Sequence, residues 1–302
     1  MPRSFSRRLF CGAAAAASWA LAQGTKPGLQ AAEQLSTGLL VRGDDMGASR
    51  SINAACLEVC QKGICHSVEV LAPGPWFLDA VMRLQDAPQI DVGVHLCLTS
   101  EWDRVKWRPL THAPSLVDAN GYFHPRTRAG NNSPAGGTGF LDSSPKLEEV
   151  ERELRAQIEL LRKHLPKVTH LSAHMGAATA TPELKALTQN LAKEFKLRLE
   201  SEGLSAAREL KHVQGVGTSK QTTKEKEESL LAFISKYQTS GRFWLLVTHP
   251  AYDDDETRAI GHPGYENVAA DRDGITKMLT SPRVLAAIKA AGIRLISYAD
   301  LS

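Results

Sequence analysis

Residues 39–47 of the chain read Leu-Leu-Val-Arg-Gly-Asp-Asp-Met-Gly, a short apolar run that leads directly into two adjacent carboxylates and a glycine. A strand that is buried on both faces has this pattern, because neither face needs polar side chains. Parallel strands of α/β folds bring their carboxyl ends to the mouth of the sheet, where these folds place their chemistry. The stretch therefore predicts a parallel strand that ends at Asp44 and Asp45. The alternative is that both carboxylates only start a turn or cap the next helix.

The rest of the chain alternates strand and helix patterns. Residues 51–62 have helical apolar spacing and end at Gly63, which suits a helix C-cap. Residues 91–96 form another apolar strand pattern, with His95 near its end. This spacing indicates βαβ units and a parallel sheet. Further strands are expected at 66–71, 168–171, 197–200, 243–248 and 293–297, and further helices at 76–84, 146–164, from 181 onward, 224–237, 270–279 and 282–291.

The composition is that of a soluble globular protein, with 42% hydrophobic and 23% charged residues. A chain of 302 residues can form one large domain, and α/β barrels commonly have this length. The net charge of +3 is small, and no run of lysine and arginine alternates with aromatic residues. Nothing therefore indicates nucleic-acid binding. We expect a single domain over residues 37–302, and the sequence leaves a homodimer open.

The N-terminus has the features of an export signal. Arg7 and Arg8 precede an apolar, alanine-rich run, and residues 20–22 form a small-x-small cleavage site. The arginine pair suggests the twin-arginine route, and the apolar run is too short to span a membrane. We expect a signal peptide over residues 1–22, a tether over 23–36, and a mature protein that is periplasmic or secreted. The alternative is a disordered basic N-terminus.

The chain beyond the predicted signal contains four cysteines: Cys56, Cys60, Cys65 and Cys97. An even number in an exported protein permits disulfides, and a Cys60–Cys65 or a Cys56–Cys97 bridge is conceivable. Buried free thiols fit the spacing equally well. No Cys-x-x-Cys pair indicates a zinc ribbon.

Residues 99–144 break the alternation of strands and helices. The segment contains Trp102, Trp107, several prolines and a loose run over 129–139 that is rich in glycine and asparagine. A long irregular segment in a compact domain is usually a functional lid or a disordered excursion. We interpret its first half as a lid and the glycine-rich half as mobile.

Four predicted strand ends carry side chains that can do chemistry: Asp44 with Asp45, His95, His174 and His249. In a barrel these ends meet at one rim, so residues distant in sequence become neighbours. A carboxylate with two neutral imidazoles is an ordinary ligand set for Zn²⁺ or another divalent metal. Each histidine alone is more often structural, but the shared position at strand ends favours a metal site. The remaining histidines lie in loops, helices or strand starts, and we interpret them as non-ligands.

Several motifs occur together along the chain. They are the Asp44-Asp45-x-Gly47 turn followed by Asn53, Gly93-Val94-His95-Leu96, Ser115-Leu116-Val117-Asp118 with Gly121 and Phe123, Glu153-Leu154-Arg155-Ala156-Gln157, His170-Leu171 followed by His174, His249-Pro250, and the tail segments 279–282 and 293–298. On these motifs the chain resembles the YdjC-type carbohydrate deacetylases, which include chitooligosaccharide deacetylases. The resemblance implies a (β/α)-barrel with its site at the carboxyl ends of the strands, hydrolysis of an acetamido sugar, and a metal held by Asp45, His95 and His174.

The chain departs from the family pattern at two positions near the last ligand. The family commonly shows Asp-x-His-x-His there, and Ser172 and Gly176 take the places of the first Asp and the last His. The three ligand positions remain, whereas the contacts to substrate near Ser172 and Gly176 are put in doubt. Ser172 stays a candidate substrate contact.

The expected function is therefore a metal-dependent hydrolase, with zinc or magnesium, that removes an acetyl group from an N-acetylated sugar or oligosaccharide. Asp44 would act as general base on the attacking water, and His249 would protonate the departing amine. Trp102 and Trp107 could offer flat apolar faces to a sugar ring, although packing suits each of them at least as well. Two other interpretations are open: an exported sugar-binding protein without turnover, and a metal-dependent esterase or amidase that acts on another substrate.

Overall fold

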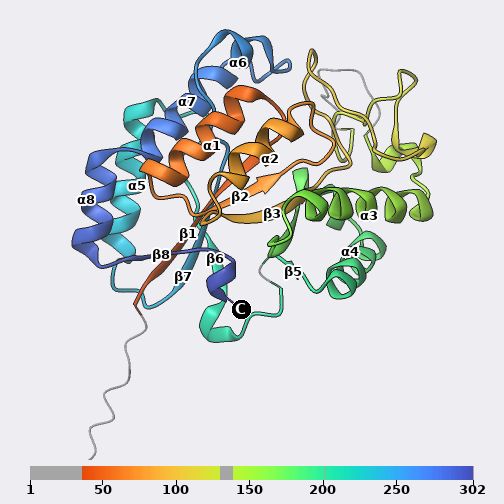
Figure 1. The fold of residues 1–302 in the computed structure, drawn as a ribbon. Helices are drawn as coiled ribbons and strands as arrows, with labels where there is room; N and C mark the ends of the chain where they lie inside the picture. Colours follow the sequence, from red (N-terminus) through yellow and green to blue (C-terminus); the bar gives the residue numbers. More distant parts are fainter. Residues whose placement is uncertain (1–35, 130–138, 201, 302) are drawn as a thin grey trace, which may run out of the picture. The chain divides into compact units, whose positions relative to one another are not determined.

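The computed structural model of the chain describes residues 36–129, 139–200 and 202–301 (Figure 1). The predicted signal peptide, nearly all of the predicted tether and most of the glycine-rich run lie outside these residues. No helix in the described part of the chain is long and apolar enough to cross a membrane.

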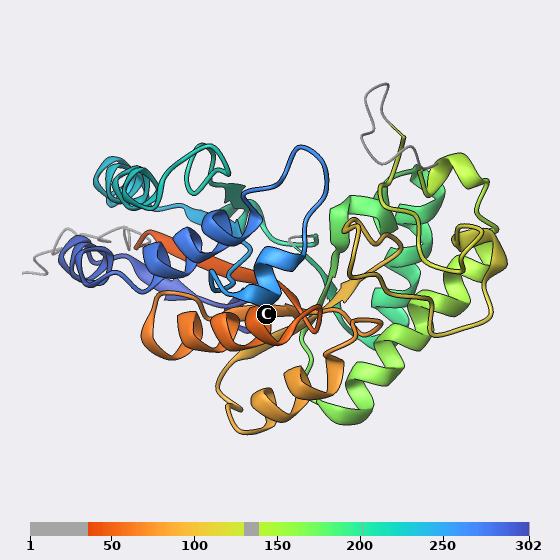
Figure 2. The ribbon, with the colours of Figure 1, turned by 90° about the horizontal axis from the view of Figure 1, so that it is seen from above.

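The strands form one parallel sheet that curls on itself (Figure 2). Its order is β5–β4–β3–β2–β1–β7–β6, and β8 pairs with the first half of β1. The predicted α/β class with parallel strands is confirmed. Among the described strands no pairing joins β5 to β6, so the barrel is open on that side. The strands are β1 (Gly38–Met46), β2 (Ser67–Val70), β3 (Asp91–Leu96), β4 (His170–Ala173), β5 (Arg198–Leu199), β6 (Leu210–His212), β7 (Phe243–Thr248) and β8 (Arg294–Ile296).

Helices surround the outside of the curled sheet (Figures 1 and 2). Local signals in the sequence set their starts: the side chain of Ser49 caps α1, and that of Thr181 caps α4 just before Pro182. The helices are α1 (Arg50–Lys62), α2 (Phe77–Gln85), α3 (Leu147–His164), α4 (Pro182–Phe195), α5 (Thr223–Tyr237), α6 (Asp255–Ala259), α7 (Val268–Leu279) and α8 (Pro282–Ala291).

Strand β1 is buried on both faces, as its uninterrupted apolar pattern predicts. Leu39 and Val41 pack outward among residues of α5, α7 and α8, whereas Leu40 belongs to the cluster inside the curl. Burial of each such side chain contributes about 1.5–3 kcal/mol. Because side chains alternate along a strand, Arg42 and Asp44 lie on the same inner side as Leu40. The interior therefore changes from apolar to charged as β1 approaches its carboxyl end.

Some elements differ from the sequence prediction. Strand β6 and helix α6 were not predicted; β6 has only three residues, of which Leu210 alone is buried, so pairing with β7 rather than an apolar pattern makes it a strand. The strand expected at residues 168–171 lies at His170–Ala173 instead. His174 consequently follows the strand directly.

The described part of residues 99–144 is packed against α3. The carboxylate of Glu153 accepts hydrogen bonds from the backbone N–H groups of Leu110 and Thr111 at 3.0 and 2.9 Å. Glu149, one helical turn earlier, accepts from the N–H of Ser115 at 2.8 Å. Hydrogen bonds to α3 therefore hold the described part of this segment, residues 99–129 and 139–144, in place; we call it the cover.

All four cysteines of the described chain are free thiols. Burial raises the pKa of Cys56 well above its usual value and that of Cys97 to about 11, so both stay protonated. The sequence left open disulfides or buried free thiols, and in the structure these four cysteines are free thiols.

Gly93 gives a test of the packing inside the curl. It lies in register between Glu69 on β2 and His170 on β4, whose side chains meet across it at 2.5 Å. A Cβ added at Gly93 would overlap both of these side chains. We expect Gly93→Ala to lower the free energy of unfolding by about 1–3 kcal/mol, measured by urea denaturation, because overpacking forces the neighbours apart.

Gly43→Ala on β1 is the matched control for this substitution. Its added Cβ would come no closer than 3.5 Å to any of its neighbours across the fold. An equal loss of stability in both variants would contradict the packing argument.

Candidate metal centre

The carboxyl end of β1 sends two adjacent aspartates to different partners. Asp45 has a φ of 70°, in the left-handed region, which costs a residue other than glycine about 1–3 kcal/mol. Gly47 has a φ of 102°, and a Cβ there would lie 2.7 Å from the carbonyl oxygen of Leu71. Asn53 fixes the turn, because its side-chain oxygen accepts the Gly47 N–H at 2.6 Å. The sharp turn thus separates the side chain of Asp45 from that of Asp44.

Three buried side chains converge at this rim: Asp45 near the end of β1, His95 on β3 and His174 just after β4. Their donor atoms all lie within 4.8 Å of one another. Nδ1 of His174 lies 3.3 Å from Oδ1 of Asp45 and 3.3 Å from Nε2 of His95. Nε2 of His95 lies 3.6 Å from the same Asp45 oxygen. One atom from each residue therefore faces a common point.

The chemistry of these three residues fits a divalent cation. Both carboxylate oxygens of Asp45 are buried and make no hydrogen bond in the described part of the chain. Oδ2 is paired with the guanidinium of Arg272 at 2.9 Å, whereas Oδ1 faces the two histidines, where a cation would satisfy it. Burial raises the pKa of Asp45, but Arg272 and His174 outweigh it and hold the pKa well below the usual range. Burial lowers the pKa of His95 well below its usual value. The site thus offers an ionised carboxylate and a neutral imidazole, the forms that bind metals.

Two residues that the sequence analysis missed contact this set of donors. Nη2 of Arg272 on α7 lies 2.9 Å from Oδ2 of Asp45. Oε2 of Glu101, in the cover after β3, lies 3.0 Å from Nε2 of His174. Burial lowers the pKa of His174, but Glu101 outweighs it and the pKa is raised well above its usual value. A carboxylate bonded to the second ring nitrogen is typical of histidines that bind metals, because it orients the ring.

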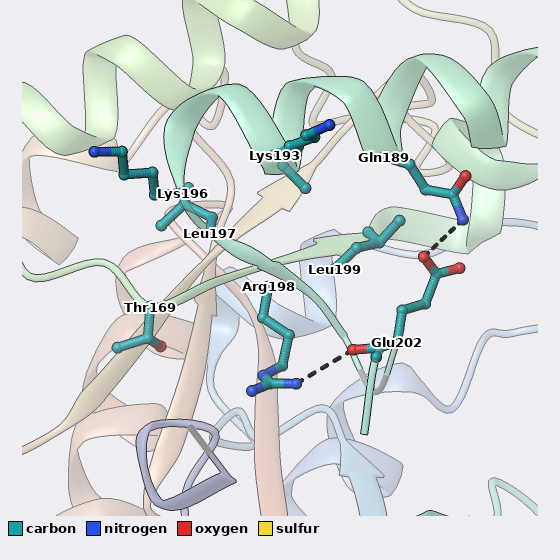
Figure 3. Close-up of a pocket in the computed structure, with 10 residues that line it drawn as sticks. Thr169, Gln189, Lys193, Lys196, Leu197, Arg198, Leu199 and Glu202 are labelled. Carbon is teal, nitrogen blue, oxygen red and sulfur yellow. Dashed lines mark hydrogen bonds between the residues drawn. The ribbon is translucent and has the colours of Figure 1, made fainter. Parts of the chain in front are cut away.

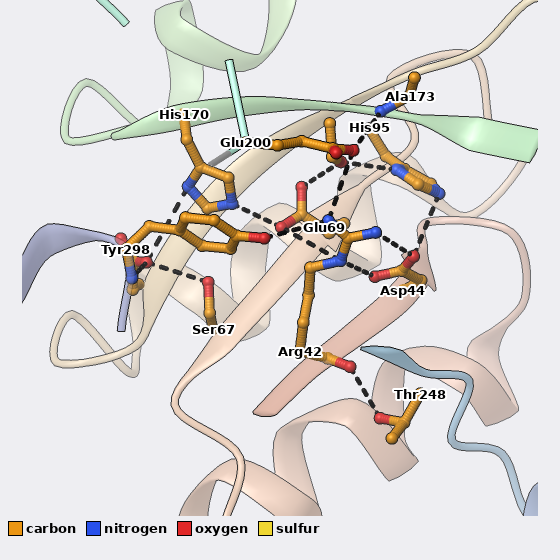
Figure 4. Close-up of polar contacts among 12 residues, drawn as sticks. Arg42, Asp44, Ser67, Glu69, His95, His170, Ala173, Glu200, Thr248 and Tyr298 are labelled. Carbon is orange, nitrogen blue, oxygen red and sulfur yellow. Dashed lines mark hydrogen bonds and ion pairs between the residues drawn. The ribbon is translucent and has the colours of Figure 1, made fainter. Parts of the chain in front are cut away.

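Asp44 and His249 lie beside the donors but outside the set. Arg42 donates to both oxygens of Asp44, from Nε at 2.7 Å and from Nη2 at 3.0 Å (Figure 4). Oδ2 of Asp44 lies 3.7 Å from Nε2 of His95 and 4.0 Å from Nε2 of His249. The side chain of His249 is 45% exposed, whereas that of Asp44 is buried. The structure therefore brings all five predicted strand-end residues together, with His249 facing solvent.

The same residues fall within a match to a known family. A family model described as YdjC-like protein matches residues 38–290, which include all five strand-end residues. The chain belongs to the YdjC-like protein family. The resemblance found in the sequence is confirmed.

Relatives named carbohydrate deacetylase match most of the chain. The one from Geobacillus stearothermophilus is 27% identical over 268 residues, which cover 86% of this chain and 96% of the relative. The one from Enterococcus faecalis is 27% identical over 274 residues, 87% of this chain and 98% of the relative. A crystal structure of an Enterococcus faecalis V583 protein named for cellobiose-phosphate cleavage aligns with a TM-score of 0.69 at 24% identity, covering 88% of this chain and 99% of that one. This structural likeness supports the YdjC-like fold.

Two tryptophans of the cover, Trp102 and Trp107, are buried in the core. Trp102 is 1% exposed and Trp107 is 2% exposed, and their rings pack edge to face at 5.5 Å. Nε1 of Trp107 donates to the carbonyl of Thr99 at 2.8 Å. The possibility that these rings offer flat faces to a sugar is therefore corrected: both point from the cover into the core, as the packing alternative had it, where their large apolar area is removed from water.

Ser172 does not lie at the surface, where a substrate would contact it. It is fully buried on β4, and its hydroxyl bonds Nδ1 of His95 at 2.7 Å and Glu69 at 2.5 Å. Both hydrogen-bonding partners are internal, so the expectation that Ser172 touches the substrate is corrected.

A hollow of about 470 Å³ lies away from these donors (Figure 3). Its lining includes Thr169, Lys193, Lys196 and Arg198 and none of the metal donors. Thr169 precedes β4, whereas His174 follows that strand. The hollow is therefore at the amino end of the strand, opposite the end that carries the chemistry.

We expect Asp45→Asn and His174→Ala each to weaken metal binding by at least about tenfold, because a site with three protein ligands has no spare donor. Elemental analysis of dialysed protein checks this. His212→Ala, which removes an exposed histidine on β6, should keep the wild-type metal content. Full metal content in His174→Ala would contradict the assignment.

Proposed function

We propose that the chain is a metal-dependent hydrolase that removes the acetyl group from an N-acetylated sugar or oligosaccharide. The observation that carries the proposal is the convergence of Asp45, His95 and His174, in which the buried Oδ1 of Asp45 faces both histidines while Oδ2 is paired with Arg272. The carbohydrate deacetylase names of the relatives support the same reaction.

The ligand set favours zinc over magnesium. Two imidazole nitrogens with one carboxylate are typical of zinc sites that keep a position open for catalysis. Magnesium prefers an octahedral shell of oxygens and retains much of its water. A site with two nitrogen donors therefore suits Zn²⁺ better.

Asp44 is the proposed general base. A divalent cation at the site supplies Lewis acidity, which activates a water molecule and polarises the acetyl carbonyl. Asp44 lies beside His95 yet is not one of the three donors, so its carboxylate is free to take the proton of the attacking water. The two hydrogen bonds from Arg42 fix the carboxylate from inside the curl and hold it in one orientation.

His249 is the proposed general acid. A protonated imidazole can give its proton to the departing amine, which is what a general acid does. The exposed side chain of His249, just after β7 and 4.0 Å from Asp44, supports this role. A sugar-binding protein without turnover would need neither this acid nor this base.

Release of acetate tests the proposed reaction. We expect the purified protein to release acetate from N-acetylated mono- or oligosaccharides, to stop after chelation, and to recover when zinc is restored. Sugar binding without acetate release would favour the binding protein, and release from acetate esters alone would favour the esterase. Amide hydrolysis that chelation leaves unchanged would contradict the role of the metal.

The roles of the two aspartates can be separated by substitution. We expect Asp44→Asn and His249→Ala to keep the metal but to lower the turnover rate by about two to four orders of magnitude, the usual contribution of a positioned acid or base. His249→Ala should affect substrates with poor leaving groups most. Single-turnover rates and metal content measured together check this. Normal rates in both variants would remove the two residues from the reaction.

We also propose that the protein is exported to the periplasm or secreted, which the Arg7-Arg8 pair and the Ala-Leu-Ala site at residues 20–22 support. The N-terminus of the protein purified from its native host should lie near Gln23. A mature chain that still begins before Arg7 would contradict export by this signal.

A further inference from the structure

The ring nitrogen of His95 that points away from the metal donors, Nδ1, bonds a serine hydroxyl. That hydroxyl in turn bonds a carboxylate. Nδ1 of His95 lies 2.7 Å from Oγ of Ser172, its register partner on β4. Ser172 in turn donates to Oε2 of Glu69 on β2 at 2.5 Å. All three side chains are at most 2% exposed, so water does not compete for these bonds. Glu69 therefore reaches His95 through one serine.

Glu69 is held as a carboxylate. Its other oxygen lies 2.5 Å from Nε2 of His170 and 3.9 Å from Nε of Arg42 (Figure 4). Burial raises the pKa of Glu69, but His170 and Arg42 outweigh it and keep the pKa below its usual value. An ionised carboxylate only accepts hydrogen bonds. Glu69 therefore requires the hydroxyl proton of Ser172.

This requirement fixes the proton on His95. A serine hydroxyl has one proton to donate, and Ser172 gives it to Glu69, so its oxygen can only accept from Nδ1 of His95. A neutral imidazole carries one N–H, which places the lone pair on Nε2. Nε2 is the atom that faces Asp45 and His174.

We propose that Glu69 and Ser172 are positioning residues that hold His95 in the form with its proton on Nδ1, so that Nε2 is ready to bind the cation. The inference rests on the proposed metal-dependent function and deepens it. The sheet builds the chain of bonds directly, because Glu69 and the Ser172–His95 pair lie on neighbouring strands and Gly93 leaves space between them.

Zinc dissociation constants measured against a chromogenic chelator test this pair. We expect Ser172→Ala and Glu69→Gln each to weaken zinc binding about 10–100-fold, the usual effect of losing a partner of a metal ligand. An amide at residue 69 can donate to the serine and so reverse the direction of the chain. The double variant should bind zinc about as weakly as the weaker single variant, because both substitutions break one chain.

Ser67→Ala is the matched control. Ser67 is equally buried on β2, and its hydroxyl also donates to a carboxylate, that of Asp91, at 2.9 Å. Its removal should lower the melting temperature without changing zinc affinity. Zinc affinities of Ser172→Ala and Glu69→Gln that match wild type would overturn the proposal that this pair positions His95. So would free-energy losses in zinc binding that add up in the double variant.

A measurement on the unaltered protein does not depend on how the variants fold. Long-range ¹H–¹⁵N correlation spectra of the zinc-loaded protein should show the ring proton of His95 on Nδ1, and a proton on Nε2 would overturn the proposal. A wild-type protein that bound no zinc would overturn the proposed function as well. Tight zinc binding and acetate release with unaffected variants would overturn the positioning pair alone.

Discussion

Charge buried inside the curled sheet must be paired, and the arrangement of the site depends on this constraint. A buried ion that loses its partner costs about 3–5 kcal/mol. Asp44 is paired with Arg42, two residues earlier on β1, and Glu69 on β2 is paired with His170 on β4, each through a short contact inside the curl. Asp45 differs, because its oxygens make no hydrogen bond and only Arg272 approaches Oδ2 closely from outside the set of donors. Asp45 is thus paired through Oδ2, while its Oδ1 faces the two histidines and is available to a cation.

The cover, the described part of residues 99–144, contributes to the same pairing of buried charges. It carries Glu101 to the second nitrogen of His174, and it buries Trp102 over Arg272, with the guanidinium 5.2 Å from the ring centre. Hydrogen bonds to Glu153 on α3 hold the segment in place. This segment, whose described part has two 3₁₀ helices, Pro114–Leu116 and Leu141–Ser143, thus fixes the charges around two of the three donors.

Local patterns in the sequence predicted much of the fold and the donors. The apolar runs that became β1, β3 and β7 are visible because both faces of each strand are buried, and a side chain at such a strand end must reach the rim. Arg272 and Glu101 could not be predicted this way, since one lies inside a helix and the other in the irregular cover. Ser172 appeared as a departure from the family pattern, and only the register of neighbouring strands shows that it links His95 to Glu69. The sequence could not decide whether the two tryptophans pack in the core or face a sugar, because an aromatic residue in an irregular segment carries no periodicity that tells core from surface.

The central claim is that Asp45, His95 and His174 together hold a catalytic cation. Anomalous diffraction from crystals grown with zinc, recorded at energies above and below the zinc absorption edge, tests it most directly. The account predicts one strong zinc peak that contacts a carboxylate oxygen of Asp45, Nε2 of His95 and Nδ1 of His174. A fully ordered site without a peak, or a zinc ion held only by other residues, would contradict it.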